Sequence, residues 1–456
     1  MGVPAPQLRP QAVRDATAYA GSWLAYRQTY LRIPGVQAAV RHDGELVHSS
    51  AHGHADVEND VPLTPEHLFR VASHSKTFTA TAVLQLVEAG ALRLDDPVSR
   101  HLDWLEPPVG DVTIREMLSH SGGVIRDGED ADHWQLMRPF PDRETLHEIA
   151  STRAAIRPRN ERFKYSNITY SLLGEVIEAV TGRSYHDYVS TEIVARLGLS
   201  RTGPELDPAR SGEYVTGYGT LATGPQRRPI DPVDTRAMAA ATGFYSTAED
   251  LCRYLEAHCP GDERLVSDAS KRLLQHAWWQ VEGLPTSWYG LGFGVDQVGE
   301  RRMVGHGGGF PGQITRSLLD PDDRLAVSVL TSAVDGPAEE LAFGVVKLID
   351  LAARQTGAPE TDRSRFAGRF ADLWGVTDVV CLDGALLMLD PTASDPTEGC
   401  FELAVEDDVT LRITTGPGYG SVGEPLRYTF APDGSVLSVR GPNGATMWPI
   451  ERYVSS

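Results

Sequence analysis

A serine and a lysine three residues apart are the first residues in this chain whose spacing suggests chemistry. Ser73 and Lys76 stand at the start of a stretch whose apolar residues recur with helical spacing, and a three-residue step along a helix places two side chains on one face. A serine hydroxyl is a weak nucleophile until a base takes its proton, and burial lowers the pKa of a lysine so that it can act as that base. The pair predicts acyl transfer through Ser73, although the spacing alone is common and also fits an exposed helix start.

Two more motifs follow along the sequence. Tyr165 and Asn167 form a Tyr-x-Asn motif that is followed at once by a helical run, and a glycine-rich segment lies near a predicted strand. Glycines let a substrate approach the backbone closely, and aimed backbone donors stabilise charge that develops only in a transition state. The alternative for such a segment is a flexible turn. Its residues are His306, Gly307, Gly308 and Gly309.

Together with their surroundings, these motifs resemble the penicillin-recognising serine hydrolases. This group includes class C β-lactamases, D-alanyl-D-alanine carboxypeptidases, D-aminopeptidases and related esterases. The resemblance covers roughly residues 12–355 and extends to three further segments, which are Phe69-Arg70-Val71-Ala72, Leu118-Ser119-His120-Ser121-Gly122-Gly123 and Gly243-Phe244-Tyr245-Ser246-Thr247-Ala248-Glu249-Asp250-Leu251.

The resemblance implies roles for the motif residues, with His306 in the catalytic group and the oxyanion or substrate-binding wall formed by Gly307, Gly308 and Gly309. Ser73 is implied to be the nucleophile, Lys76 its immediate partner, and Tyr165 the phenol that moves protons to and from the leaving group. Asn167 is implied to hydrogen-bond Lys76 and the substrate amide. The backbone N–H groups of Ser73 and Gly309 are implied to form the oxyanion hole. Whether Lys76 or Tyr165 is the base stays open.

The glycine-rich motif departs from the family pattern at its first residue. β-Lactamases and carboxypeptidases usually carry lysine where this chain has His306. Because a histidine near its reference pKa of about 6.5 is largely neutral at pH 7 to 8, it offers a hydrogen bond but little attraction for a carboxylate. We therefore expect neutral or amine-bearing substrates to be preferred over anionic penicillins and D-Ala-D-Ala termini.

Other motif-like residues favour simpler interpretations. His52, His54, Asp56 and His67 lie near the nucleophile in the sequence, but surface histidines of an early loop explain them as well as a metal site does. We predict no metal and no cofactor. The His-Gly-Gly-Gly segment also matches lipase-like α/β-hydrolases, but the Gly-x-Ser-x-Gly elbow of that fold is absent from the sequence.

Length and charge limit the classes of partner. With 456 residues the chain is too long for one average domain, and its formal net charge of -20 opposes binding to nucleic acid or anionic lipid. No apolar run approaches the length of a membrane span. We expect a cytoplasmic protein with a small-molecule or short-peptide substrate, no nucleic-acid or membrane partner, and possible homodimers.

Predicted strands occur near both ends of residues 12–355, with mostly helical signals between them. This pattern implies one sheet built from distant segments and covered by helices, an α/β or α+β domain, and the resemblance implies a β-lactamase-like antiparallel sheet with a helical subdomain. Strands are expected as a hairpin at 36–47 and at 303–304, 314–319 and 325–331. Helices are expected at 13–30, 73–89, 168–180 and 338–353.

Two helix ends carry local signals. Gly182 is placed to end the helix at 168–180, because glycine readily adopts the left-handed conformation at a helix C-terminus. Ser246 and Glu249 predict a capping box at the start of another helix.

The pattern of residue types changes beyond residue 355. Residues 356–364 are polar and contain proline, and residues 365–456 show short alternating runs between evenly spaced turn signals. This pattern predicts an all-β barrel, and it resembles the small lipocalin-like barrels appended to D-aminopeptidases. We therefore expect a hydrolase domain at 12–355, a linker at 356–364 and a barrel at 365–456. The barrel either stabilises or dimerises the protein, or reaches over the site with a loop.

These observations predict a serine hydrolase that acts on amide or ester bonds through a Ser73 acyl-enzyme. The resemblance favours a D-aminopeptidase, a D-amino-acid amidase or an esterase. Alternatives are an acyl transferase of the peptide-cyclase type, a β-lactamase or DD-carboxypeptidase, and a non-catalytic peptide-binding protein.

Overall fold

The computed structural model describes residues 5–355, 363–417 and 422–454. The chain forms two compact units, one of residues Ile33–Ala342 and one that combines the residues up to Arg32 with those from Phe343 onward. The sheet and the candidate site residues belong to the first unit. The predicted division at 356–364 stays a prediction, and residues 356–362 lie outside the described part of the chain.

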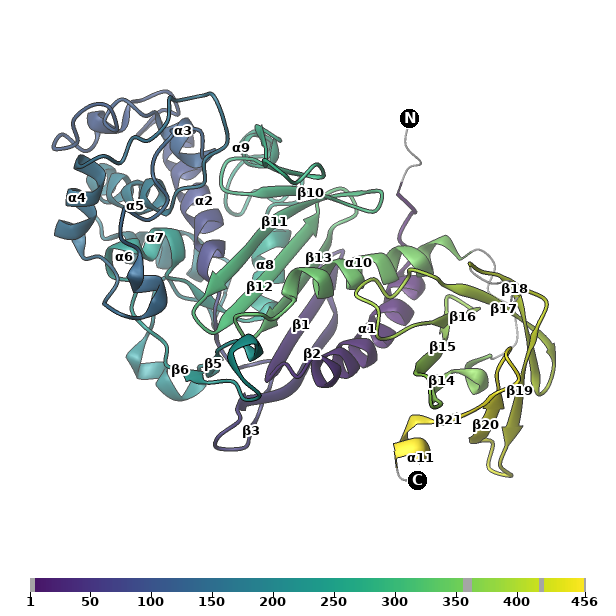
Figure 1. Cartoon of the computed structure of the whole chain (residues 1–456). Coiled ribbons are helices and arrows are strands. Elements are labelled where there is room, and N and C mark those ends of the chain that lie inside the picture. The colour runs from purple at the N-terminus through teal and green to yellow at the C-terminus, as the bar shows by residue number, and fades with distance from the viewer. Residues whose placement is uncertain (1–4, 356–362, 418–421, 455–456) are drawn as a thin grey trace. The chain divides into compact units, whose positions relative to one another are not determined.

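Within the described residues, nine strands of the first unit form one antiparallel sheet in the order β3-β2-β1-β13-β12-β11-β10-β9-β8 (Figure 1). Val36 of β1 lies opposite Thr331 of β13, so strands from both ends of the unit are neighbours, as predicted. The strands are β1 (Gly35–His42), β2 (Glu45–Asp56), β3 (Val61–Pro62), β8 (Trp279–Gln280), β9 (Ser287–Tyr289), β10 (Gly294–Val298), β11 (Arg301–Phe310), β12 (Gln313–Asp320) and β13 (Leu325–Thr331).

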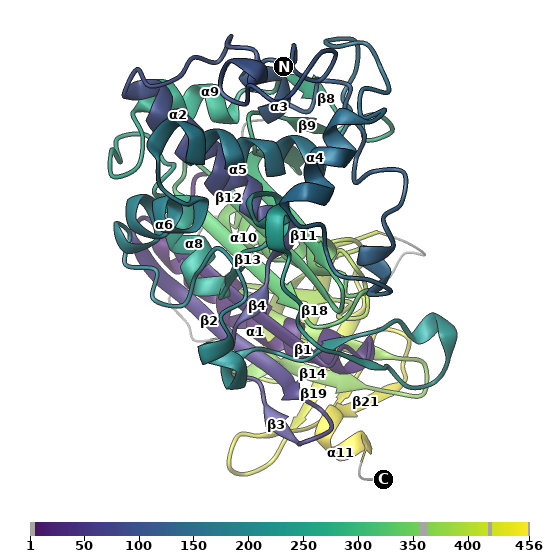
Figure 2. The same cartoon turned by 90° about the vertical axis from the view of Figure 1, so that its left-hand side faces the viewer.

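Helices from the middle of the sequence cover this sheet. Helix α8 packs on β1, β12 and β13, and α2 packs against α5 and α7, while Figure 2 shows α4, α5 and α6 in front of the strands. No helix in the described part of the chain is long and apolar enough to cross a membrane. The helices are α2 (Ser75–Glu88), α3 (Ile114–Leu118), α4 (Arg143–Ser151), α5 (Asn167–Thr181), α6 (Tyr185–Val189), α7 (Ala239–Thr242), α8 (Ala248–Glu256) and α9 (Asp268–Gln275).

Helix α2 is held in the unit by an aromatic stack. The ring of Phe78 lies between those of Phe244 and Tyr254, with centroid distances of 4.2 and 3.8 Å. All three side chains are fully or almost fully buried. Because Phe78 follows Lys76 by two residues, the stack also fixes the helix turn that carries the predicted catalytic pair.

One of the two local helix signals is confirmed and the other is wrong by one residue. Gly182 ends α5 with a φ of 66°, as predicted. Helix α8 is capped by Thr247, whose side chain accepts from Asp250 N, and not by Ser246. Ser246 lies in the two-residue strand β7 (Tyr245–Ser246), which pairs with β4 (Phe69–Arg70), and its hydroxyl lies 2.7 Å from that of Thr202. Strand pairing therefore keeps Ser246 extended.

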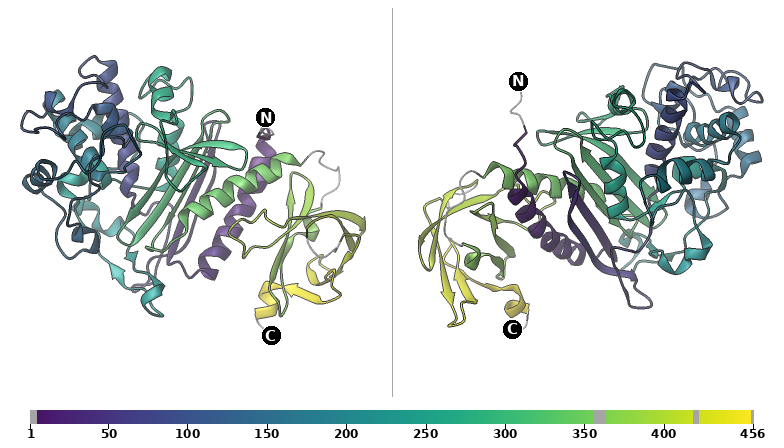
Figure 3. Two further views of the ribbon diagram at one scale, coloured as in Figure 1. Left: turned by 45° about the horizontal axis from the view of Figure 1, so that its top comes forward. Right: turned by 180° about the vertical axis from the view of Figure 1, so that it is seen from behind.

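The second unit contains the predicted C-terminal barrel. Eight described strands close into an all-β barrel with its own apolar core, and Figure 3 shows them in two views. In the same unit Tyr19 of α1 (Pro10–Tyr30) donates to Asp378 at 2.8 Å, and α10 (Ala338–Arg354) begins in the first unit and continues into the second. The barrel strands are β14 (Gly368–Ala371), β15 (Val376–Leu382), β16 (Ala385–Leu389), β17 (Phe401–Asp407), β18 (Thr410–Thr415), β19 (Pro425–Phe430), β20 (Val436–Arg440) and β21 (Thr446–Pro449).

The stack around Phe78 generates a prediction about stability. Phe78→Ala is expected to lower the free energy of unfolding by about 3 to 5 kcal/mol, because it removes a buried ring and leaves a cavity. Phe78→Leu is the control and should cost less, since leucine retains much of the volume. Urea unfolding followed by tryptophan fluorescence measures both. A loss below about 1 kcal/mol for the alanine variant would show that the stack does not hold α2.

Candidate active site

The candidate nucleophile lies in a short connection between strand β4 and helix α2. Val71 N donates to Phe244 O at 2.9 Å, and the chain then enters α2 through a 3-10 segment, Ala72–His74. Ala72 has a φ of 48°, in the left-handed region that residues other than glycine seldom adopt. Of residues 68–84, only Ser73 is not buried. The connection therefore leaves the Ser73 hydroxyl accessible while its neighbours are packed.

The two residues that follow Ser73 hold this connection in shape. Ser75 Oγ donates to Ala72 O at 2.6 Å and accepts from Phe244 N at 3.0 Å. The Nδ1 of His74 lies 2.9 Å from Val71 O, and burial lowers the pKa of His74 to about 4. Both side chains are buried, so they support the turn and do not face a substrate.

Lys76 is fully buried beneath Ser73 and contacts three oxygen atoms. Its Nζ lies 3.1 Å from Ser73 Oγ, 2.7 Å from Asn167 Oδ1 and 2.8 Å from the carbonyl oxygen of Ala241. Burial lowers the pKa of Lys76 well below its usual value, and Asp127 opposes this shift. Burial of this side chain therefore favours the neutral amine.

The orientation of Asn167 decides which way that amine points. Asn167 Nδ2 donates to Asp127 Oδ1 at 2.7 Å, and a carboxylate can only accept, so Asn167 Oδ1 must face Lys76. A neutral amine has two N–H donors and one lone pair. If Lys76 is neutral, Asn167 and the α7 carbonyl take its two donors, and its lone pair is then available to the hydroxyl of Ser73.

Tyr165 approaches Ser73 Oγ as well, with its hydroxyl at 2.8 Å. Burial raises the pKa of the Tyr165 phenol, so the phenol keeps its proton at neutral pH. The turn that carries Tyr165 is held by His120, whose Nδ1 accepts from Ser166 N at 3.2 Å. The Tyr165 phenol thus carries a proton close to Ser73 Oγ.

His306 makes its hydrogen bonds within the protein. Its Nε2 lies 2.9 Å from the hydroxyl of Tyr289 and its Nδ1 lies 2.5 Å from Gly307 O. The residue is only 8 % exposed, and burial lowers the pKa of the imidazole well below its usual value. Both ring nitrogens are engaged within the protein, so in this arrangement the imidazole has no nitrogen left to bind a substrate.

The glycines after His306 lie in β11 and pack against the nucleophile connection. A Cβ atom on Gly308 would be 2.1 Å from Val71 O and 2.6 Å from Thr315 Oγ1. Glycine is therefore required at 308 because two backbone segments meet there. Gly309 is the next residue of β11, and it is exposed.

The structure brings most of the predicted site residues together. Contacts of 3.1 Å or less link Ser73 to Lys76 and Tyr165, and Lys76 to Asn167. The sequence analysis missed three partners of this group. The Ala241 carbonyl is a backbone group without a sequence signal, and neither Asp127 nor Tyr289 belongs to a motif that we singled out.

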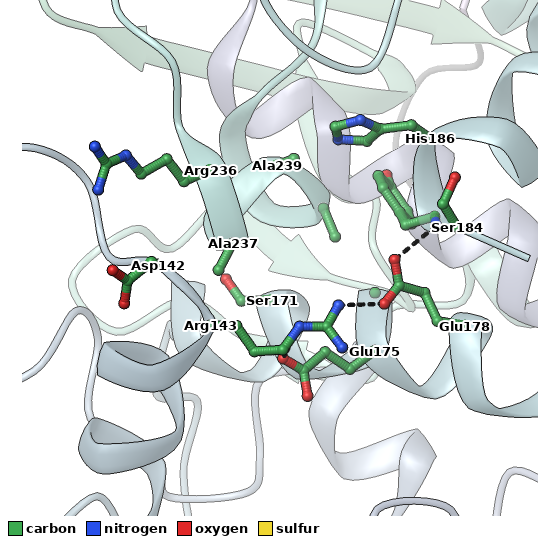
Figure 4. A pocket seen from close by; sticks show the side chains of 13 residues that line it. Asp142, Arg143, Ser171, Glu175, Glu178, Ser184, His186, Arg236, Ala237 and Ala239 are labelled. Atoms are coloured by element: carbon green, nitrogen blue, oxygen red, sulfur yellow. Dashed lines mark hydrogen bonds and ion pairs between the residues drawn. The ribbon is translucent and has the colours of Figure 1, made fainter.

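Other clusters lie apart from this group. A cavity of about 360 Å³ between α4, α5 and α6 is lined by charged side chains, and Figure 4 shows Arg143 beside Glu175 and Glu178. Neither Ser73 nor Lys76 lines it. In the described part of the chain, no group of three His, Cys, Asp or Glu side chains could hold a metal ion.

The close approach at Gly308 generates a prediction about activity. Gly308→Ala is expected to lower kcat by about tenfold or more, because the added methyl group pushes β11 away from Val71 and small misplacements cost up to about 100-fold. Gly294→Ala, in the neighbouring strand β10, is the matched control, since its Cβ would lie 3.5 Å from Gly305 O, an ordinary contact, and Gly294 has no role in the proposed site. Circular dichroism checks folding and hydrolysis of an aryl ester gives the rate. Equal rates for the two variants would contradict the packing argument.

Comparisons with known proteins identify relatives of this chain. The Beta-lactamase family model matches residues 23–350. Penicillin-binding protein 4 of Amycolatopsis lactamdurans is 28% identical over 325 residues, which are 67% of this chain and 82% of that protein. Esterase EstB of Burkholderia gladioli is 30% identical over 261 residues, 50% of this chain and 66% of that protein.

Solved structures at lower identity show the same fold. The octameric penicillin-binding protein homologue from Pyrococcus abyssi covers 94% of this chain and 99% of its own, with a TM-score of 0.66 and 22% identity. The D-amino acid amidase from Ochrobactrum anthropi SV3 covers 74% and 98%, with a TM-score of 0.62 and 24% identity. The match of the family model over most of the chain, together with this shared fold, leads to one conclusion: this chain belongs to the Beta-lactamase family, whose members include serine hydrolases.

Proposed function

We propose that this protein hydrolyses amide or ester bonds through an acyl-enzyme on Ser73. One observation carries the proposal: the Ser73 hydroxyl lies 3.1 Å from a buried lysine amine whose donors face other acceptors, and 2.8 Å from a phenol. Such an arrangement gives a weak nucleophile both a base and a proton donor. A merely structural serine would not need either group.

In the proposed mechanism, Lys76 accepts the Ser73 proton as Oγ bonds to the substrate carbonyl carbon. The backbone N–H groups of Ser73 and Gly309 stabilise the oxyanion that forms. Tyr165 donates its proton to the departing amine or alcohol as the bond between the carbonyl carbon and that group breaks, and the proton held by Lys76 then restores the phenol. Water next hydrolyses the acyl-enzyme and frees Ser73.

The substrates that we propose are D-aminoacyl amides or peptides, or short esters. Three considerations support this class. First, one relative is an esterase. Second, one neighbour in fold is a D-amino acid amidase, and third, the motif at 306–309 lacks the lysine of β-lactamases and carboxypeptidases. One relative is a penicillin-binding protein, so the carboxypeptidase alternative is tested with the same substrate panel.

The test is covalent labelling combined with a substrate panel. Wild-type protein should form an acyl adduct of Ser73, detected by mass spectrometry, with at least one of a D-aminoacyl amide, an acyl-D-Ala-D-Ala peptide, nitrocefin and an aryl ester. Ser73→Ala should abolish both labelling and turnover, because it removes the nucleophile but little packing. Ser75→Ala is the control and should stay active, although loss of its bond to Phe244 N costs about 1 to 3 kcal/mol of stability. An active Ser73→Ala variant would refute the proposal.

A pH profile separates the two possible bases. If Lys76 is the base, kcat/KM falls as the pH falls through the lowered pKa of Lys76, because the protonated amine cannot accept the Ser73 proton. This limb should lie well below the usual lysine pKa of about 10.4. Tyr165→Phe should lower kcat by about two to four powers of ten and leave the limb in place. Disappearance of the limb in Tyr165→Phe would assign the base role to Tyr165.

A further inference from the structure

Arg126 lies directly beside the proposed proton donor. Its guanidinium carbon is 5.2 Å from the centre of the Tyr165 ring, and its side chain is 64% exposed. The position is fixed, because Arg126 O accepts from Asn167 N at 2.8 Å and from Ile168 N at 3.3 Å at the start of α5. Arg126 therefore combines a rigid backbone with an accessible charge.

Most of this guanidinium is unused within the described residues. Arg126 Nε donates to Asp127 Oδ2 at 3.1 Å, and no partner of its two terminal amine groups is found in the described part of the chain. Because only Nε is paired with Asp127 and the side chain is 64% exposed, several N–H donors of the guanidinium are accessible to solvent. Those donors suit a planar, two-oxygen acceptor such as a carboxylate.

A second cation lies against the same tyrosine. Lys164 Nζ donates to Tyr165 O at 3.2 Å, and no carboxylate bonds to it in the described residues. Burial, and next the charge of Arg126, lower the pKa of Lys164, so the two cations repel each other. The chain as a whole has a net charge of -20. The two cations beside the proposed proton donor form a local positive region, which attracts anions.

We propose that Arg126 binds a carboxylate on the leaving group of the substrate. The proposal rests on the proposed function, in which Tyr165 protonates the departing atom, so the leaving group passes the ring over which Arg126 lies. A leaving group that is an amino acid or a peptide carries such a carboxylate, whereas ammonia and simple alcohols do not. Arg126 thus favours peptide substrates over simple amides and neutral esters.

This anchor differs in position from the one that the third motif lacks. The lysine usual in β-lactamases and carboxypeptidases stands on the strand where this chain has His306, and His306 is buried and internally bonded. Arg126 lies instead on the helical side, next to α5. The positive charge is therefore presented from another direction, and it selects a different placement of the carboxylate.

The experiment compares two esters whose leaving groups are close in shape and differ in charge. 3-Carboxyphenyl acetate and 3-carbamoylphenyl acetate share the acyl group, so any influence of Arg126 on Lys76 cancels in the ratio of their kcat/KM values. Each value is first divided by the rate of hydroxide-catalysed hydrolysis of the same ester, which corrects for the different leaving groups. Wild-type protein should favour the carboxylate by about five- to tenfold, the usual range for an accessible charge-assisted contact. The preference should shrink as salt rises, because the contact is exposed to solvent.

Variants assign the preference to a residue. Arg126→Gln should bring the ratio to about one, and Arg126→Lys should retain part of the preference. Arg162→Gln is the matched control: Arg162 has a side chain that is 58% exposed and pairs with Glu282 at 3.4 Å, so its loss should leave the ratio unchanged. A wild-type ratio near one, or a ratio that survives Arg126→Gln, would overturn the inference. Absence of any acyl-Ser73 with both esters and with D-alanylglycine would instead overturn the proposed function.

Discussion

The amine of Lys76 is enclosed by three elements of the fold, and the geometry of the site follows from its burial. Helix α2 carries it, α5 contributes the Asn167 amide and α7 contributes the Ala241 carbonyl. Because the interior disfavours the charged form, burial lowers the pKa of the amine. In the proposed mechanism the two acceptors take its hydrogens, and its lone pair is left for Ser73. A change in the relative position of these three helices would remove that alignment.

The sheet reaches the same site through a close backbone approach. Gly308 of β11 lies against Val71, one residue before the turn that carries Ser73. Side-chain volume at that position would separate the strand from the nucleophile. The candidate site is thus assembled where the helical region and the sheet meet, and glycine is needed for packing as much as for access of a substrate.

Positive charge lies on the helical side of the site and not on the third motif. Burial lowers the pKa of His306, whose ring is bonded to Tyr289 and Gly307. The exposed Arg126 and the half-buried Lys164 lie around Tyr165. The ion pair of Arg126 with Asp127 links this charge to Asn167, and through Asn167 to Lys76. Recognition at the surface and the state of the buried amine therefore share one chain of contacts.

The sequence alone determined the features that depend on short-range order. Alternating patterns located the strands on both sides of the turn at Asp43, the strand that begins at Leu325 and the C-terminal barrel. A helical pattern located the helix that ends at Gly182. All of these depend on local backbone preferences and on periodic burial. Ser73, Lys76, Tyr165 and Asn167 were recognisable because their motifs are contiguous. The roles of the Ala241 carbonyl and Asp127, the internal bonds of His306, the cap at Thr247 and the place of Arg126 over Tyr165 were decided only by the tertiary structure. Each depends on which distant groups meet, and long-range contacts leave no periodic trace in the sequence.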